Sequence, residues 1–147
     1  MLGGHDSIAV LAVTDLDRAR TFYEGVLGLT SPREAPEGVL YTAGSSVFLV
    51  YPSSFAGTNR ATAMSFQIPG DQFDAEVQTL RERGVTFSTF EAEGLTWVDG
   101  VASYDDFKSA WFEDPDGNVL HLETRGEVTT GRPRPRRPRE GATRAGP

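Results

Sequence analysis

The feature that most constrains the fold of this chain is an internal repeat. The first copy begins with the β-rich apolar run 7–13, and the second begins with the similar run 62–68. A segment with helical spacing of apolar residues follows each run, and further short β-rich stretches come after it. The repeat predicts two modules with one order of elements: a strand, a helix, and then three strands.

Each predicted helix has a start signal and a stop signal. In the first, the stretch 14–17 offers side-chain oxygens to the free amides of a first turn, and Gly28 follows the end. In the second, Pro69, Gly70 and Asp71 open the helix and Gly84 closes it. Spacings of three and four predict the buried residues Leu16, Ala19, Tyr23 and Val26 in the first helix, and Phe73, Val77 and Leu80 in the second.

The remaining β-rich stretches complete an α+β fold. Strands are predicted at 29–34, 38–43 and 46–51 in the first module, and near 85–90, 100–104, 109–113 and 118–123 in the second. The turn Asp114-Pro-Asp-Gly-Asn118 is rich in residues that tolerate left-handed backbone, so it predicts a hairpin between the last two strands.

Length and composition limit the classes of function. The 147 residues suffice for one domain, predicted at 1–127, and the Arg/Pro-rich stretch 128–147 is predicted to be a disordered tail. The chain has no cysteine, which excludes thiolate metal sites and disulfides. Residues 1–131 hold eight basic and 20 acidic side chains, a net charge of −12. Such a body repels nucleic acid and anionic membranes, and we expect a cytoplasmic protein with neither partner.

Four stretches carry a resemblance to a known family. They are the opening 13–23, the short 27–29, the run 64–68 and the closing hairpin 110–123. Together they resemble the vicinal oxygen chelate superfamily, which includes glyoxalase I, extradiol dioxygenases, fosfomycin-resistance enzymes and bleomycin-binding proteins. The resemblance covers about residues 7–124. It implies two βαβββ modules whose mixed sheets curl around a cup with the helices outside, and a homodimer that completes the cups.

The positions that the resemblance assigns to metal ligands hold the wrong residues. They are Ile8, Leu49, Ala63 and His121 in this sequence. A divalent ion needs about three or four donors, and one imidazole does not suffice. His5 would reach the first position only by an odd register slip, which would invert every side chain of that strand. We therefore predict no metal cofactor; a divalent ion held by His121 with neighbouring carboxylates is the alternative.

Strand alternation predicts which side chains line the cup. Residues 47, 49 and 51 share one face with 119, 121 and 123, whereas 48, 50, 120 and 122 point to the core. Phe55, Trp97 and Tyr104 are expected in loops at the mouth, and the loop 52–60 is a candidate lid or hinge. The predicted ligand-binding set is Tyr51, Phe55, Ala63, Ser65, Gln67, Trp97, Tyr104, Trp111, Glu113, His121 and Glu123.

The sequence favours a metal-free protein that binds a small molecule and sequesters an aromatic or cationic natural product. The acidic body, the aromatic cup and a histidine at the last ligand position resemble bleomycin-binding resistance proteins. The main alternative is a metal-dependent lyase, isomerase or dioxygenase of glyoxalase type with an atypical ligand set built on His121 and Glu123. Two others are a metal-free enzyme with His121 as acid or base, and a scaffold whose basic tail binds an acidic partner.

Overall fold

The computed structural model describes residues 1–125, so the predicted tail at 128–147 lies outside the described residues. After a short 3₁₀ turn, η1 (Leu2–Gly4), the first module contains β1 (Ala9–Val13), α1 (Leu16–Arg20), the π-helical continuation η2 (Thr21–Val26), β2 (Arg33–Glu34), β3 (Val39–Ala43) and β4 (Ser46–Pro52). The second module contains β5 (Thr62–Ile68), α2 (Phe73–Glu82), β6 (Thr96–Val98), β7 (Val101–Tyr104), β8 (Phe107–Glu113) and β9 (Val119–Thr124).

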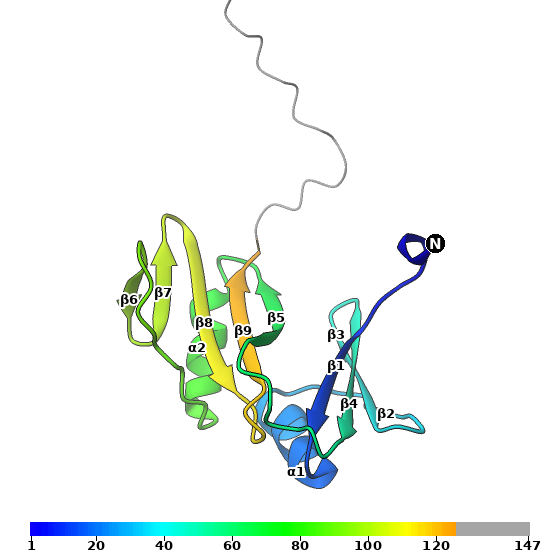
Figure 1. Cartoon of the computed structure of the whole chain (residues 1–147). Coiled ribbons are helices and arrows are strands. Elements are labelled where there is room, and N and C mark those ends of the chain that lie inside the picture. Colours follow the sequence, from blue (N-terminus) through cyan, green and yellow to red (C-terminus); the bar gives the residue numbers. More distant parts are fainter. Residues whose placement is uncertain (126–147) are drawn as a thin grey trace, which may run out of the picture.

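The predicted repeat is confirmed by the topology of the sheets. The first sheet has the order β1-β4-β3-β2 and the second β5-β9-β8-β7-β6. In each, the opening strand pairs in parallel with the last strand of its module, and the other pairs are antiparallel. The two sheets stay separate within one chain and are not closed into a single cup (Figure 1). The fold is therefore α+β with two repeated modules.

The predicted strand at 85–90 is wrong. Within it, Ser88 alone forms an isolated bridge, to Trp111, and the edge of the sheet is formed instead by β6. Phe87 packs its ring at 5.8 Å from the ring of Phe112, so this β-prone segment follows the core rather than a partner strand. The predicted strand at 29–34 is also shorter, because only Arg33 and Glu34 pair with β3.

The core lies on one face of each sheet, against the helices. The predicted face of the second helix is confirmed, because Phe73, Val77 and Leu80 are buried. On the first helix Ala19 and Tyr23 are buried, whereas Leu16 and Val26 are only partly buried. The Asp15 carboxylate caps α1 by accepting from the amides of Asp17 and Arg18. The strand residues that alternation predicted to point to the core, Phe48, Val50, Leu120 and Leu122, are all buried.

The turn 114–118 forms the predicted hairpin and also joins the two modules. The amide of Gly117 donates to the carbonyl of Asp114 across the turn, at 3.0 Å. The hydroxyl of Tyr23, on the first helix, donates to Asp114 Oδ2 at 2.8 Å, and both residues are buried. The Asn118 side-chain amide donates to Asp114 Oδ2 and to the carbonyl of Ala12 on β1, each at 2.8 Å.

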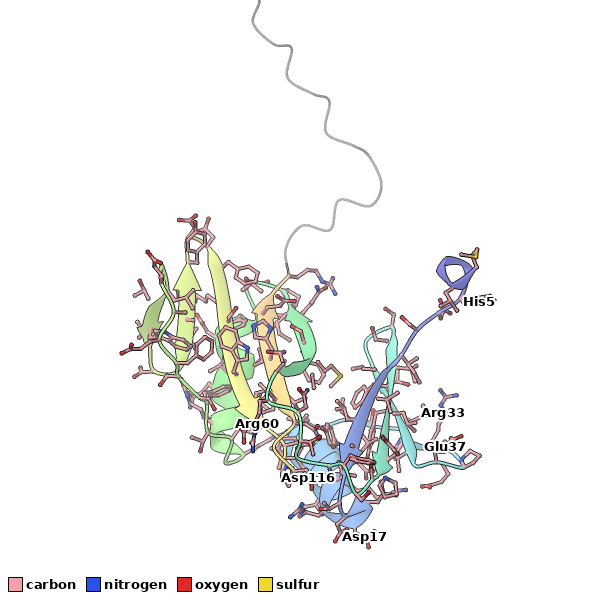
Figure 2. All side chains as sticks on the ribbon, in the orientation of Figure 1. His5, Asp17, Arg33, Glu37, Arg60 and Asp116 are labelled. Atoms are coloured by element: carbon pink, nitrogen blue, oxygen red, sulfur yellow. The ribbon has the colours of Figure 1, made fainter. Side chains whose placement is uncertain are left out.

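A second set of bonds at the same turn involves Asp116. Its Oδ1 accepts from the Thr14 amide at 3.1 Å, from the Thr14 hydroxyl at 2.7 Å and from Arg18 Nη2 at 2.9 Å. Figure 2 labels Asp116 at the base of the molecule, where the hairpin meets the first helix. We call the seven residues of both sets the inter-module clasp: Ala12, Thr14, Arg18, Tyr23, Asp114, Asp116 and Asn118.

Among residues 1–125, no helix combines the length and the apolar character that a membrane crossing requires.

Candidate functional site

The centre of the candidate site is His121, on the exposed face of the second sheet. It is 9% exposed, and its ring is covered by Trp111 on the adjacent strand, with ring centroids 4.5 Å apart and 21° between planes. The hydroxyl of Ser65, on the other neighbouring strand, lies 2.8 Å from Nδ1. The second ring nitrogen, Nε2, is buried and has no hydrogen-bond partner among the described residues.

Burial lowers the pKa of His121, and the nearby Glu123 carboxylate opposes this shift only in part. The imidazole is therefore neutral at pH 7, since its ordinary pKa is already about 6.5. A neutral imidazole has one N–H and one lone pair, and Ser65 uses one of them at Nδ1. The other, at Nε2, is left for a group outside the described chain.

Three aromatic rings extend the site from His121 towards the edge of the sheet. Phe90 contacts both tryptophans edge-on, with centroids 5.2 Å from Trp97 and 4.8 Å from Trp111. The two tryptophan rings lie 6.0 Å apart. The indole N–H of Trp97 is buried and without an acceptor in residues 1–125. We call Phe90, Trp97 and Trp111 the aromatic cluster.

The structure brings together several of the predicted ligand-binding residues. Ser65, Trp111 and His121 are in contact, and Trp97 reaches them through the aromatic cluster. Gln67 and Glu123 continue the same face one step along the strands, with Gln67 Nε2 3.5 Å from Glu123 Oε1. Strand alternation predicts this grouping correctly because β5 and β9 run parallel in register from Ser65 onward.

Three predicted placements need correction. A bulge between Thr62 and Met64 makes Ala63 an extra residue, and Ala63 packs against the core while Thr62 takes the place beside Val119. Trp97 belongs to strand β6 rather than to a loop, and Tyr104 is the last residue of β7, the strand predicted at 100–104, rather than a loop residue. Trp97 is misplaced because the sequence pattern predicts no strand at β6, which pairs with β7.

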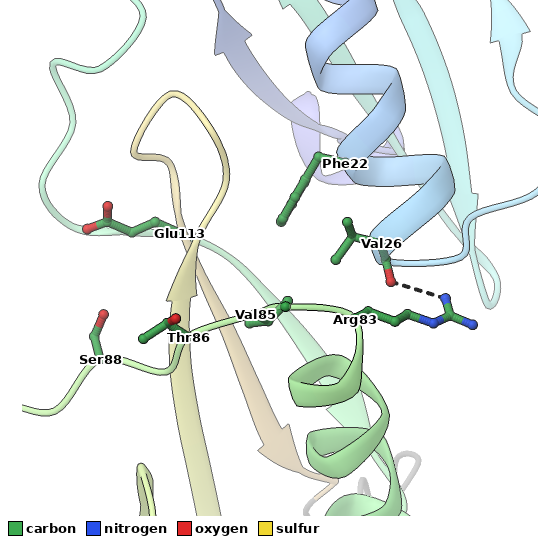
Figure 3. A pocket seen from close by; sticks show the side chains of 8 residues that line it. Phe22, Val26, Arg83, Val85, Thr86, Ser88 and Glu113 are labelled. Carbon is green, nitrogen blue, oxygen red and sulfur yellow. Dashed lines mark hydrogen bonds between the residues drawn. The ribbon is translucent and has the colours of Figure 1, made fainter.

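Glu113 lies away from this group, although it shares the strand face of Trp111. It lines a separate cavity of about 430 Å³ between the first helix and the end of α2 (Figure 3). Phe22, Val26 and Arg83 line the same cavity, and Arg83 Nη1 donates to the carbonyl of Val26 at 3.1 Å.

The predicted residues of the first module lie on the other sheet and on the linker that follows it. Tyr51 is half-buried on β4, and Phe55 is 76% exposed in the loop after this strand. Ile8 and Val10 are 47% and 53% exposed on or beside β1. An apolar face of the first sheet is therefore open to solvent.

The residues at the four family ligand positions do not fit a divalent ion. Ile8 and Leu49 are on the first module, Ala63 is in the bulge of β5, and the Nδ1 of His121 is occupied by Ser65. His5 precedes β1 on the projecting N-terminal segment (Figure 2), so no register slip brings it into the strand. Nowhere in residues 1–125 do three or more His, Cys, Asp or Glu side chains gather in a group suited to a metal ion.

Three residues near the site are absent from the predicted set: Phe90, a member of the aromatic cluster, and Glu91 and Glu93, which line a cavity with Phe90 and Trp97. A usable signal was present: the stretch 84–107 contains five carboxylates and five aromatic residues but neither lysine nor arginine. Such a composition on one segment indicates an acidic surface with exposed rings.

Comparisons with known proteins agree on the fold. The family model described as Glyoxalase/Bleomycin resistance protein/Dioxygenase superfamily matches residues 6–122. None of the curated proteins matches the sequence at a significant level.

Solved structures with the same architecture include two fosfomycin resistance proteins and an oxidase. FosX from Mesorhizobium loti superposes with a TM-score of 0.60 at 18% identity, over 84% of this chain and 93% of that one. FosX from Listeria monocytogenes, complexed with Mn(II) and sulfate, gives 0.62 at 16% identity, over 84% and 91%. The oxidase ChaP-H1 gives 0.61 at 21% identity, over 83% and 98%. At these identities the likeness extends to the fold alone.

Proposed function

The chain belongs to the Glyoxalase/Bleomycin resistance protein/Dioxygenase superfamily, and on that premise we propose that it is a metal-free binding protein. Its ligand is a small organic molecule, an aromatic or cationic natural product, held on the face formed by Ser65, Trp111 and His121. Binding alone is the activity, so the protein lowers the free concentration of its ligand by mass action.

The observation that carries this proposal is the unpartnered Nε2 of His121. A buried polar atom without a partner costs about 1–3 kcal/mol of stability, so such atoms are rare unless something else completes them. Here the atom lies beside the Trp111 ring, which offers an apolar surface for stacking. A flat ligand with a polar group would complete both contacts at once, and Trp111 would have to shift to admit it because Nε2 is buried beneath that ring.

The same proposal includes a homodimer. Ile8 and Val10 expose apolar surface on the first sheet, and Leu49 and Tyr51 continue that face. One face of an isolated four-stranded sheet normally needs cover, because exposed apolar surface is unfavourable in water. We propose that this face of one chain covers the Trp111–His121 face of a second chain, which places Tyr51 opposite the aromatic cluster.

Metal-dependent chemistry is the main alternative. It would need donors that the positions of Ile8, Leu49 and Ala63 do not supply. A second alternative is a metal-free enzyme in which His121 transfers a proton. Neither alternative is favoured by an observation of its own, because Ser65 occupies Nδ1 of His121 and, within residues 1–125, no carboxylate bonds to Nε2. The cytoplasm is the location that we predict for each of these functions.

The proposal is tested by a thermal-shift screen of natural-product antibiotics and aromatic amines against the full chain, with and without a chelator. A ligand at about 100 times its Kd stabilises the fold by about 2.7 kcal/mol, and we expect that gain to persist with chelator. Trp111→Ala should abolish it, whereas Phe107→Ala, at the far end of the same strand, should retain it. Stoichiometric divalent metal in the purified protein, with binding or turnover lost to chelator, would overturn the proposal.

A further inference from the structure

We infer that the ligand is an organic cation, a tertiary or quaternary ammonium compound, and that its charged group binds in the corner between Phe90 and Trp97, beside Glu91 and Glu93. This inference rests on the proposed function, since it names the class of ligand that the same face would take. The charged group occupies a subsite next to Trp111, and the rest of the ligand extends over Trp111 and His121.

The shape of the subsite comes from a cavity of about 460 Å³. It is lined by Phe90, Glu91, Ala92, Glu93, Leu95 and Trp97. The Phe90 and Trp97 rings meet at 74°, so together they form an open corner. Phe90 is 46% exposed, and Tyr104 lies beside the loop at Gly94, within 4 Å of where a side chain at Gly94 would begin. A cation in this corner contacts the electron-rich faces of two rings.

Within the part of the chain that the structure describes, no basic side chain pairs with the carboxylates of the subsite. Within residues 1–125, neither Glu91 nor Glu93 forms a hydrogen bond or an ion pair through its side chain. The nearest basic residues in sequence are engaged elsewhere. Arg83 donates to the carbonyl of Val26, Arg81 donates to the carbonyl of Asp99 and lies over the Phe87 ring, and Lys108 is paired with Asp74. The stretch 84–107 thus presents five carboxylates without a basic residue.

Two aromatic rings beside two carboxylates favour an alkylated ammonium group over other ions. An anion would be repelled by Glu91 and Glu93. A hydrated Mg²⁺ or Ca²⁺ prefers a shell of oxygen ligands, which two aromatic walls do not provide. An alkylammonium group has weakly held water and an apolar surface, so it gains from the rings and from the carboxylates together.

The test compares choline with its neutral isostere, 3,3-dimethylbutan-1-ol, by tryptophan fluorescence titration of the full chain. The two differ only in charge, so their ratio of affinities isolates the inferred contact. We expect choline to bind about tenfold more tightly at low salt, with the ratio falling as ionic strength rises. In the double variant Glu91→Gln, Glu93→Gln the ratio should fall to near one.

A matched control removes two charges nearby. Asp105→Asn with Asp106→Asn lowers the charge of the same stretch by the same amount outside the cavity lining, and it should keep most of the ratio. Equal affinity of the two isosteres, or an unchanged ratio in the Glu91/Glu93 variant, would overturn the inference. If the inference fails but a neutral aromatic compound still binds through Trp111, the proposed binding function stands without an ammonium subsite. If no compound in the thermal-shift screen binds, the proposed function itself fails.

Discussion

The inter-module clasp gives a sharp prediction about stability, at the bond between Tyr23 and Asp114. Tyr23→Phe removes one hydroxyl that donates to Asp114 Oδ2 at 2.8 Å, and both residues are buried. Phenylalanine fills the same volume, so no cavity is formed. The loss is therefore that of one buried hydrogen bond to a carboxylate, about 1.5–3 kcal/mol. For a domain of this size the melting temperature should fall by about 4–12 °C.

Tyr41→Phe is the matched control. Its hydroxyl donates to Glu24 Oε1 at 2.9 Å, but the Glu24 side chain is partly open to water, which replaces the lost bond. We expect a loss below about 1 kcal/mol there. Urea unfolding of both variants, with a double-mutant cycle of Tyr23→Phe and Asp114→Asn, measures the difference. A loss for Tyr23→Phe no larger than that for Tyr41→Phe, or a coupling energy near zero, would refute the reasoning.

Two further predictions concern backbone packing and pH. A Cβ at Gly38 would lie 2.1 Å from the carbonyl oxygen of Val50, so Gly38→Ala should lower the free energy of unfolding in urea by about 3 kcal/mol or more. Gly70 has open space around it, so Gly70→Ala should lower it far less. Burial lowers the pKa of His121 in the folded state, so the unfolded chain takes up the proton at a higher pH than the folded chain does. The contribution of His121 to stability is therefore complete above about pH 6.5 and should decline as the pH falls towards the folded pKa, by at most about 1.4 kcal/mol per pH unit. In melting curves recorded from pH 8 to 5, His121→Gln should lose this dependence and His5→Gln should keep it.

The repeat and the helices were predictable because they depend on local signals. Apolar spacing identified the buried residues of both helices, and strand alternation identified Leu120 and Leu122 as core and His121 as a residue of the opposite face. The positions of caps and turns, such as Asp15 and the 114–118 hairpin, follow from the backbone preferences of single residues. Such signals need no knowledge of the other module.

The rest depends on pairing between distant segments. The bulge at Ala63 arises where β5 adjusts its register to β9, and nothing in the sequence of β5 marks it. The segment 85–90 has the composition of a strand, but it does not pair as one. Phe87 packs against Phe112 in the core, and β6 forms the edge of the sheet. Trp97 was consequently predicted in a loop, and its contact with Phe90 was missed. Alternation along one strand predicts which face of the sheet a side chain lies on, but it does not predict which strand pairs with it or which distant side chain it contacts.

The residues that carry the family resemblance and the residues that would carry chemistry are different sets. Tyr23, Asp114 and Asn118 belong to the clasp, where they hold the helix of one module to the hairpin of the other. None of the four family ligand positions makes a clasp bond, so Ile8 and Leu49 can replace donors without cost to the join between modules. This separation explains how the family motif persists in a chain whose ligand positions do not fit a metal. A ligand for this protein therefore has to be sought at the His121 face, which takes no part in the clasp.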